Sequence, residues 1–208
     1  MQALQQKWVN LISSFTKEEE LVESSWQLIE KHYTQKNRAY HNLTHIQAML
    51  QEAEQHLAQL EDKETLQLAI WFHDIIYNPL KKDNEQQSAE VARQLLHQTA
   101  LDPERIHRCY QQILLTIKHE PLPTSSLDGQ FLIDFDLEVL SRDWEAYQLY
   151  TQQIRKEYWM YPGPLFRKGR KQAMARFLQR PTIYQTTAYR DKEALARANI
   201  RREIKELL

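Results

Sequence analysis

The chain has 208 residues, enough for one domain with a substantial core, and its 27 Lys and Arg nearly balance its 28 Asp and Glu. Only three glycines accompany many Leu, Gln, Glu, Arg and Ala residues, so we expect an all-α, single-domain multi-helix bundle. The sequence has no apolar run that could span a membrane and no Gly-rich phosphate loop, and its single cysteine excludes an internal disulfide, as expected of a cytoplasmic protein.

Charge is distributed unevenly along this nearly neutral chain. Residues 151–208 contain 14 Lys and Arg against 5 Asp and Glu, whereas residues 1–150 contain 13 against 23. We expect basic helices within residues 143–207 to pack on an acidic body whose core covers about residues 35–140. The part of this basic layer that faces a cleft would attract phosphate, and binding of nucleic acid by these helices is a less favoured alternative.

Apolar residues at helical spacing predict two helices at the start of the chain, followed by a polar loop over residues 33–43. The loop contains Arg38 and His41, which are free to reach a bound ligand. Thr44 is placed to cap the next helix, which carries His45 in its first turn. His45 is therefore expected to face the core.

Residues 62–77 are predicted to form a buried helix that ends near Pro79. This helix carries the adjacent pair His73 and Asp74. Burying an ionised carboxylate is costly unless it is paired or binds a metal ion, so we do not expect two ordinary core residues here. The alternative is a buried histidine that is hydrogen-bonded to its neighbour and has no chemical role.

A short charged turn over residues 79–88 follows directly, so its polar side chains are expected near the same site. Glu85 is the candidate for orienting an attacking water or for transferring a proton. Asn84 and Ser88 are candidates for binding substrate oxygens. The structural alternative for this turn is that Asp83 caps the next helix.

Two carboxylates occur in a later apolar segment. A helix that runs to about Lys118 is followed by a Pro/Ser loop over residues 121–127, and the next helix, over residues 128–140, carries Asp134 and Asp136. Since these two residues are two positions apart, they cannot face the same way on a helix. The chain is predicted to end in three amphipathic helices, over residues 143–161, 164–179 and 190–207.

Histidine and aspartate in three separate apolar segments predict one buried site to which three helices contribute. Imidazole and carboxylate ligands suit a divalent metal ion such as Mn, Mg, Fe, Co, Ni or Zn. The candidate ligands are His45, His73 and Asp74 together with Asp134 or Asp136. Four such ligands would leave coordination positions for water and substrate.

The same residues resemble the HD-domain superfamily of metal-dependent phosphohydrolases, because His45, His73-Asp74 and a late Asp stand in the order of its H…HD…D signature. The short sequence motifs around them are similar to those of small bacterial HD phosphohydrolases, and the similarity covers about residues 35–205. These motifs are Tyr40-His41-x-x-x-His45-Ile46, Phe72-His73-Asp74-Ile75-x-Tyr77, Asp83-Asn84-Glu85-x-x-Ser88-Ala89, Asp134-x-Asp136-Leu137, Ile154-Arg155-x-Glu157-Tyr158 and Gly169-Arg170.

The resemblance implies an HD-type bundle with a central metal site. It favours Asp136 as the last ligand, because the superfamily carries that ligand in a motif in which Leu follows Asp. Asp134 is the alternative. It also implies a polar cluster in which Lys118 binds phosphate and His119 acts as an acid or as an extra ligand. The alternative for this basic pair is that it complements the C-terminal end of its helix.

The reaction implied by the resemblance is hydrolysis of a phosphomonoester or a pyrophosphate, with a nucleotide as the expected substrate, through attack of a metal-bound water. Asp74 would act in catalysis, and Arg38 and Lys118 would neutralise phosphate charge. The alternative function is a non-catalytic metal-containing helical module that binds a nucleotide, a nucleic acid or a protein partner. The sequence does not fix the oligomeric state, and a homodimer is compatible with it.

Overall fold

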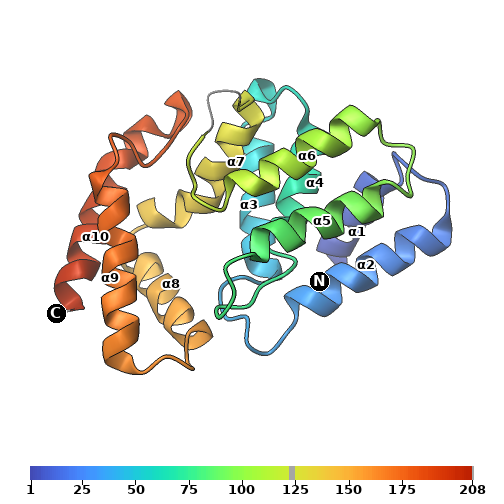
Figure 1. The fold of residues 1–208 in the computed structure, drawn as a ribbon. Helices are drawn as coiled ribbons and strands as arrows, with labels where there is room; N and C mark the ends of the chain where they lie inside the picture. The colour runs from blue at the N-terminus through green and yellow to red at the C-terminus, as the bar shows by residue number, and fades with distance from the viewer. Residues whose placement is uncertain (122–124, 208) are drawn as a thin grey trace.

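The computed structural model describes residues 1–121 and 125–207, and within them the chain forms helices and no β-strand, which confirms the expected all-α fold (Figure 1). The α-helices are α1 (Gln2–Ile12), α2 (Glu19–Tyr33), α3 (Leu43–Gln55), α4 (Lys63–Phe72), α5 (Asn84–Leu96), α6 (Pro103–Leu115), α7 (Leu127–Leu137), α8 (Trp144–Glu157), α9 (Gly163–Gln179) and α10 (Glu193–Glu206). Three short 3₁₀ helices join them: η1 (Leu57–Gln59), η2 (Glu138–Ser141) and η3 (Thr187–Lys192). Within the described part of the chain, every helix is too short or too polar to cross a membrane.

Helix α4 lies at the centre of the molecule, because α3, α5, α6 and α7 all pack against it. Its side chains Leu66 and Ile70 are fully buried. Trp71 meets Trp8 of α1 and Trp26 of α2 edge to face, with ring centroids 5.6 and 6.3 Å apart. Aromatic pairs in this geometry add to the stabilisation that comes from burying their apolar area. The C-terminal end of α4, which directly precedes His73, is therefore held firmly in place.

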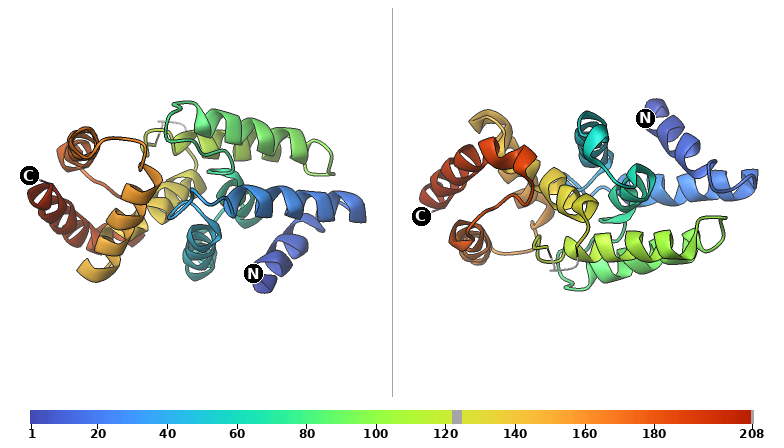
Figure 2. Two further views of the ribbon diagram at one scale, coloured as in Figure 1. Left: turned by 90° about the horizontal axis from the view of Figure 1, so that it is seen from below. Right: turned by 90° about the horizontal axis from the view of Figure 1, so that it is seen from above.

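Helices α8, α9 and α10 gather at one side of the molecule, opposite α1 and α2 (Figures 1 and 2). The buried core nevertheless extends as one cluster from Leu4 in α1 to Ile200 in α10. Asn199 of α10 donates hydrogen bonds from its side-chain amide to the carbonyl oxygens of Leu140 and Arg142, at 3.0 and 2.8 Å. The C-terminal helices thus share a core with the body.

Several cations of the basic region, residues 151–208, are paired with carboxylates. The ammonium of Lys192 lies 3.5 Å from Glu52 and 3.1 Å from Glu138, both in the acidic body. The guanidinium of Arg170 lies 2.7 Å from Glu203 of α10. Part of the positive charge of residues 151–208 is therefore neutralised inside the fold.

The helix before His73 ends earlier than the sequence predicts. Helix α4 stops at Phe72, and turns replace the predicted helix up to Tyr77. The guanidinium of Arg38 donates hydrogen bonds to the carbonyl oxygens of Asp74 and Ile75, at 2.6 and 2.7 Å. These carbonyl groups are thereby satisfied by a side chain, so the backbone does not need to continue as a helix.

Helix α3 begins at Leu43, so Thr44 lies inside the helix and is not its cap. The cap is Asn42, whose side-chain oxygen accepts a hydrogen bond from the backbone N–H of Thr44 at 2.8 Å. The predicted loop over residues 121–127 includes residues 122–124, which lie outside the described residues, and α7 begins at its last position.

Candidate metal centre

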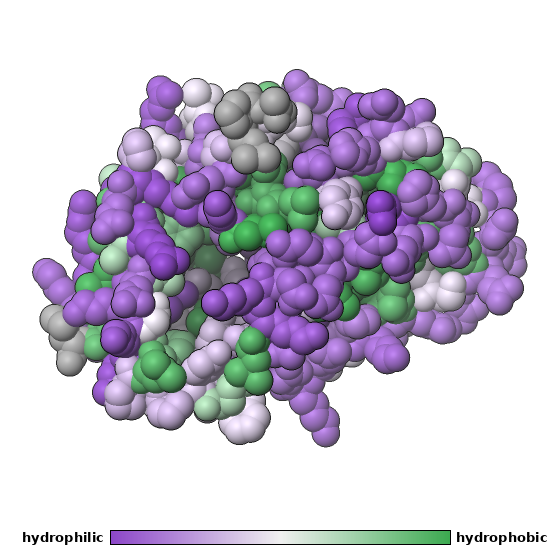
Figure 3. Space-filling model, viewed as in Figure 1, coloured by the Kyte–Doolittle hydropathy of each residue, from purple (hydrophilic) through white to green (hydrophobic). Residues whose placement is uncertain are grey.

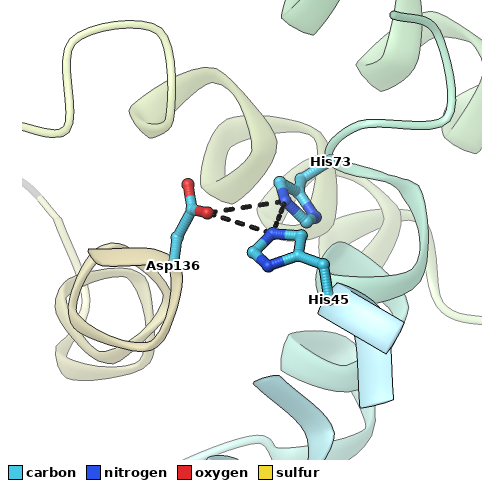
Figure 4. A group of neighbouring side chains, drawn as sticks. All are labelled: His45, His73 and Asp136. Carbon is cyan, nitrogen blue, oxygen red and sulfur yellow. Dashed lines mark hydrogen bonds and ion pairs between the residues drawn. The ribbon is translucent and has the colours of Figure 1, made fainter. Parts of the chain in front are cut away.

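Two histidines and one carboxylate from three helices converge at the centre of the molecule (Figure 4). His45 lies in the first turn of α3, His73 directly follows α4, and Asp136 lies near the end of α7. Nε2 of His45 lies 3.2 Å from Nε2 of His73 and 3.2 Å from Oδ1 of Asp136. One potential ligand atom from each residue lies within 4.8 Å of the other two.

This spacing fits a bound metal ion. Two neighbouring ligand atoms that each lie about 2.0–2.2 Å from an ion are separated by about 3.0–3.5 Å, and the separations of 3.2 Å around His45 fall in this range. Nδ1 of His73 lies 2.9 Å from the carbonyl oxygen of Ile70. A proton on Nδ1 makes that hydrogen bond and leaves the lone pair of Nε2 for a ligand bond. The three residues could therefore hold a metal ion.

Asp74 lies beside this set. Its Oδ2 is 3.1 Å from Nε2 of His73 and 3.9 Å from Nε2 of His41. Because the chain turns after α4, Asp74 does not follow helical spacing and its side chain lies on the same side as that of His73. Its carboxylate is 13% exposed and lines a cleft, so it can contact both an ion and a substrate.

The carboxylates and histidines of the centre shift one another's pKa values. Burial alone would lower the pKa of His73, but the charges of Asp74 and Asp136 raise it to about 9. Burial would raise the pKa of Asp74, but His73 and His41 hold it below its usual value. The pKa of His45 is lowered, because burial outweighs its contact with Asp136. Ionised carboxylates close together in a buried place favour a cation between them.

A carboxylate from α8 organises the loop in front of the metal centre. Glu157 is completely buried, and its Oε1 accepts hydrogen bonds from the backbone N–H groups of Tyr40 and His41, at 2.7 and 2.9 Å. Its Oε2 lies 2.6 Å from Nδ1 of His41 and accepts a hydrogen bond from the hydroxyl of Tyr77 at 2.8 Å. These contacts turn Nε2 of His41 toward Asp74. No role was expected for Glu157, although it stands in one of the motifs that resemble the superfamily.

Three residues that were expected to bind substrate bind the backbone. The guanidinium of Arg38 is buried against carbonyl groups of the loops on both sides of the centre. The side chain of Asn84, which also lines the cleft, bonds the backbone N–H and C=O of Asn78, each at 3.0 Å. The hydroxyl of Ser88 accepts a hydrogen bond from the N–H of Ile76 at 3.0 Å. All three side chains satisfy buried backbone groups and so hold the turns around Asp74 in place.

Asp134 and Asp136 point to different parts of the molecule, as their spacing predicts. The carboxylate of Asp134 accepts hydrogen bonds from the backbone N–H groups of Gln185 and Thr186, at 2.6 and 2.8 Å, and from the hydroxyl of Thr186 at 2.7 Å. It anchors the segment before η3. Of the two carboxylates, Asp136 is the one that faces His45.

His119 orients Asp136 from the opposite side. Nε2 of His119 lies 2.8 Å from Oδ2 of Asp136. The backbone of His119 has a φ of 51°, a left-handed conformation that is uncommon for residues other than glycine, and Arg180 donates a hydrogen bond to its carbonyl oxygen at 2.8 Å. This backbone turn directs the imidazole to Asp136. Lys118, expected to bind phosphate, is exposed and does not line the cleft.

A cleft of about 810 Å³ lies between the metal centre and the C-terminal helices, and Figure 3 shows the surface hollowed there, with hydrophobic residues in the hollow. Its polar end is lined by His41, Asp74, Glu85, His119 and Asp136. Burial raises the pKa of Glu85. Lys81 and Lys82 also line the cleft, as expected for the charged turn over residues 79–88, although no role was assigned to either of them.

No protein-family model, curated protein or solved structure matches this chain.

Proposed function

We propose that the protein is an HD-type metal-dependent phosphohydrolase that acts on a phosphomonoester or a pyrophosphate, with a nucleotide as the expected substrate. The observation that carries this proposal is the convergence of His45, His73 and Asp136, with ligand atoms within 4.8 Å of one another, at the polar end of a cleft. These residues stand in the order of the H…HD…D signature. Asp74, 3.1 Å from His73, is the fourth proposed ligand.

When bound by these four residues, a divalent ion such as Mn, Mg, Fe, Co, Ni or Zn lowers the pKa of a coordinated water and withdraws charge from a phosphoryl oxygen. Phosphoryl transfer depends on positioning and on neutralising charge more than on covalent chemistry. Lys81 and Lys82, which line the cleft, would neutralise phosphate charge. We propose that Lys118 does not serve this purpose, since it lies outside the cleft.

Three further side chains that line the cleft would transfer a proton, orient a ligand residue or contact the substrate. Glu85 lines the cleft and has a pKa raised by burial, which favours uptake of a proton by its carboxylate. His119 would hold Asp136 in the orientation that binds the ion. His41, oriented by Glu157, would contact a substrate oxygen beside Asp74.

The test is phosphate release from a panel of nucleoside mono-, di- and triphosphates and pyrophosphorylated nucleotides, first with Mn²⁺ and then with a chelator. Wild type should release phosphate only with the metal. Asp74→Ala should not release phosphate, while its circular dichroism spectrum stays that of wild type. His107→Ala is the matched control, because His107 is exposed on α6 and its loss should leave the rate unchanged.

Measuring metal content and nucleic-acid binding alongside phosphate release separates the alternative functions. A protein that holds its metal ion but turns over no phosphate ester would be the non-catalytic module that binds a nucleotide or a protein partner. Binding of nucleic acid that weakens steeply with salt and survives removal of the metal would point to the basic C-terminal helices. Turnover that persists in chelator or in Asp74→Ala would contradict the proposal.

A further inference from the structure

Helices α8 and α9 present an apolar face to the cleft, on the side away from the metal centre. The cleft-lining residues of α9 recur at helical spacing and include Leu165, Phe166, Gly169, Ala173 and Phe177. Tyr150 and Ile154 of α8, and Tyr158 directly after it, follow the same spacing and also line the cleft. We call this surface the α8–α9 wall. An apolar helix face normally packs against another element, but this one borders an open cleft of about 810 Å³ and so can bind an apolar group.

Gly169 keeps the middle of the wall open. It lies inside α9, where glycine is a poorer helix former than alanine. A Cβ atom at this position would have no other described atom within 4 Å, apart from the neighbouring backbone of its own helix, and the φ of Gly169 is not positive. Neither packing nor backbone conformation therefore requires a glycine. Its effect is to leave room for a ligand in the cleft.

The α8–α9 wall is continuous with the metal centre. The ring of Phe177 in α9 lies 6.2 Å, centroid to centroid, from the ring of His119 at the polar end of the cleft. On the α8 side, the ring of Tyr150 lies 4.8 Å from that of Tyr40, which lies 4.9 Å from that of His45. A molecule with its phosphate at the metal centre would therefore place the rest of its atoms against aromatic rings.

Apart from Arg170, the charged residues of the cleft lie at its polar end or are exposed at its rim. Lys81, Lys82 and Arg176 line the cleft and are exposed. Arg170 also lines it, but its side chain is only 9% exposed and is bound to Glu203 at 2.7 Å. The arrangement matches a ligand that is charged at one end and apolar at the other.

We infer that the α8–α9 wall is a subsite for a flat ring system joined to the substrate phosphate, and that Gly169 sets the size of the ring that fits. This inference rests on the proposed phosphohydrolase function and names the substrate class of that site. Aromatic side chains favour flat rings because stacking depends on ring faces and tolerates different ring identities. A nucleobase is a ring of this kind.

The test compares adenosine 5′-monophosphate with ribose 5-phosphate, which has the same sugar and phosphate but no ring system. Wild type should prefer the nucleotide by about tenfold or more in kcat/KM, the effect expected from stacking one base. Gly169→Leu should lower kcat/KM for the nucleotide to nearly that for ribose 5-phosphate, whose own value stays unchanged. Lys168→Leu adds the same side chain at an exposed neighbouring position outside the cleft and should change neither value.

Equal kcat/KM for the two substrates in wild type, or equal losses for both in Gly169→Leu, would overturn the inference. Octyl phosphate, which is apolar but flexible, should be a poor substrate, and a kcat/KM equal to that of the nucleotide would overturn the assignment of a ring.

Release of phosphate neither from these esters nor from the panel of nucleoside phosphates and pyrophosphorylated nucleotides would defeat the proposed function, and the wall is then tested by adenosine alone, by calorimetry in the presence of chelator. Adenosine binding that is lost in Gly169→Leu would support the ring subsite. Absence of adenosine binding to wild type would overturn it.

Discussion

The metal centre and the α8–α9 wall border the same cleft but are built in opposite ways. In the metal centre, polar side chains are buried and held by specific partners, as His73 is by Ile70 and Asp136 by His119. In the wall, apolar side chains reach the surface, and Leu165 is 53% exposed where His73 is 1% exposed. A buried polar group is costly unless its partners are in place, whereas partly exposed apolar area costs little per side chain. We therefore expect the metal centre to tolerate almost no substitution and the wall to tolerate many.

The largest effect should come from replacing Asp136, one of the two carboxylates near the end of α7, by asparagine. Asp136→Asn should lose the metal ion and reduce turnover by more than about 100-fold, since even groups that merely support a ligand cost 10–100-fold when they are changed. Asp134→Asn should keep the metal ion and lose about 1–3 kcal/mol of unfolding free energy, because an amide nitrogen cannot accept the hydrogen bonds from residues 185 and 186.

Metal content measured by plasma mass spectrometry, together with urea unfolding, separates the two variants. If Asp136→Asn keeps its metal ion and Asp134→Asn loses it, the assignment of the two carboxylates is wrong.

Glu157 joins the two regions, so changing it should affect both. Glu157→Gln should lower the free energy of unfolding by about 2 kcal/mol, because a buried amide cannot accept every hydrogen bond from Tyr40, His41 and Tyr77. Its kcat should also fall, while its metal content stays that of wild type.

The matched control for Glu157→Gln is Glu145→Gln, because Glu145 is exposed in the first turn of α8 and should change stability by less than about 0.5 kcal/mol. Urea unfolding of the two variants gives the comparison. Equal unfolding free energies would show that Glu157 does not hold the loop.

The smallest effect should be a gain in stability from the wall. Gly169→Ala should raise the free energy of unfolding by about 0.5–1 kcal/mol, because alanine is the better helix former and its methyl group meets open space. Gly129→Ala in α7 is the control, because its Cβ would lie 2.7 Å from Cδ1 of Leu115 and should destabilise the fold. Thermal unfolding of both variants decides the matter, and a loss of stability in Gly169→Ala would mean that α9 needs its glycine.

The residues around the metal centre could be predicted because their burial is chemically anomalous. His45, His73 and Asp136 stand in apolar segments, where an unpaired polar group would be costly, and the structure brings all three together. Spacing shows only that Asp134 and Asp136 face different ways. The resemblance favoured Asp136, and Asp136 is the one that faces His45 in the structure.

The roles of the surrounding polar residues depend on contacts that lie far apart in the chain. A polar side chain in a loop can bind a ligand or a backbone group, and Arg38 binds backbone because the carbonyls of Asp74 and Ile75 meet it in the folded chain. The same contact explains why the predicted helix over residues 62–77 stops at Phe72. Helical periodicity likewise predicted an amphipathic helix over residues 143–161 but could not show that a cleft borders α8.

The buried carboxylate of Glu157 also limits how this protein can be divided. All of the proposed ligands lie between His45 and Asp136, so a fragment that ends with η2 would keep every one of them. That fragment would nevertheless lack the partner of His41 and Tyr77, because Glu157 comes from α8. The C-terminal helices therefore cannot be replaced freely. A segment that replaces them would have to place a carboxylate where Glu157 lies, beside His41 and Tyr77.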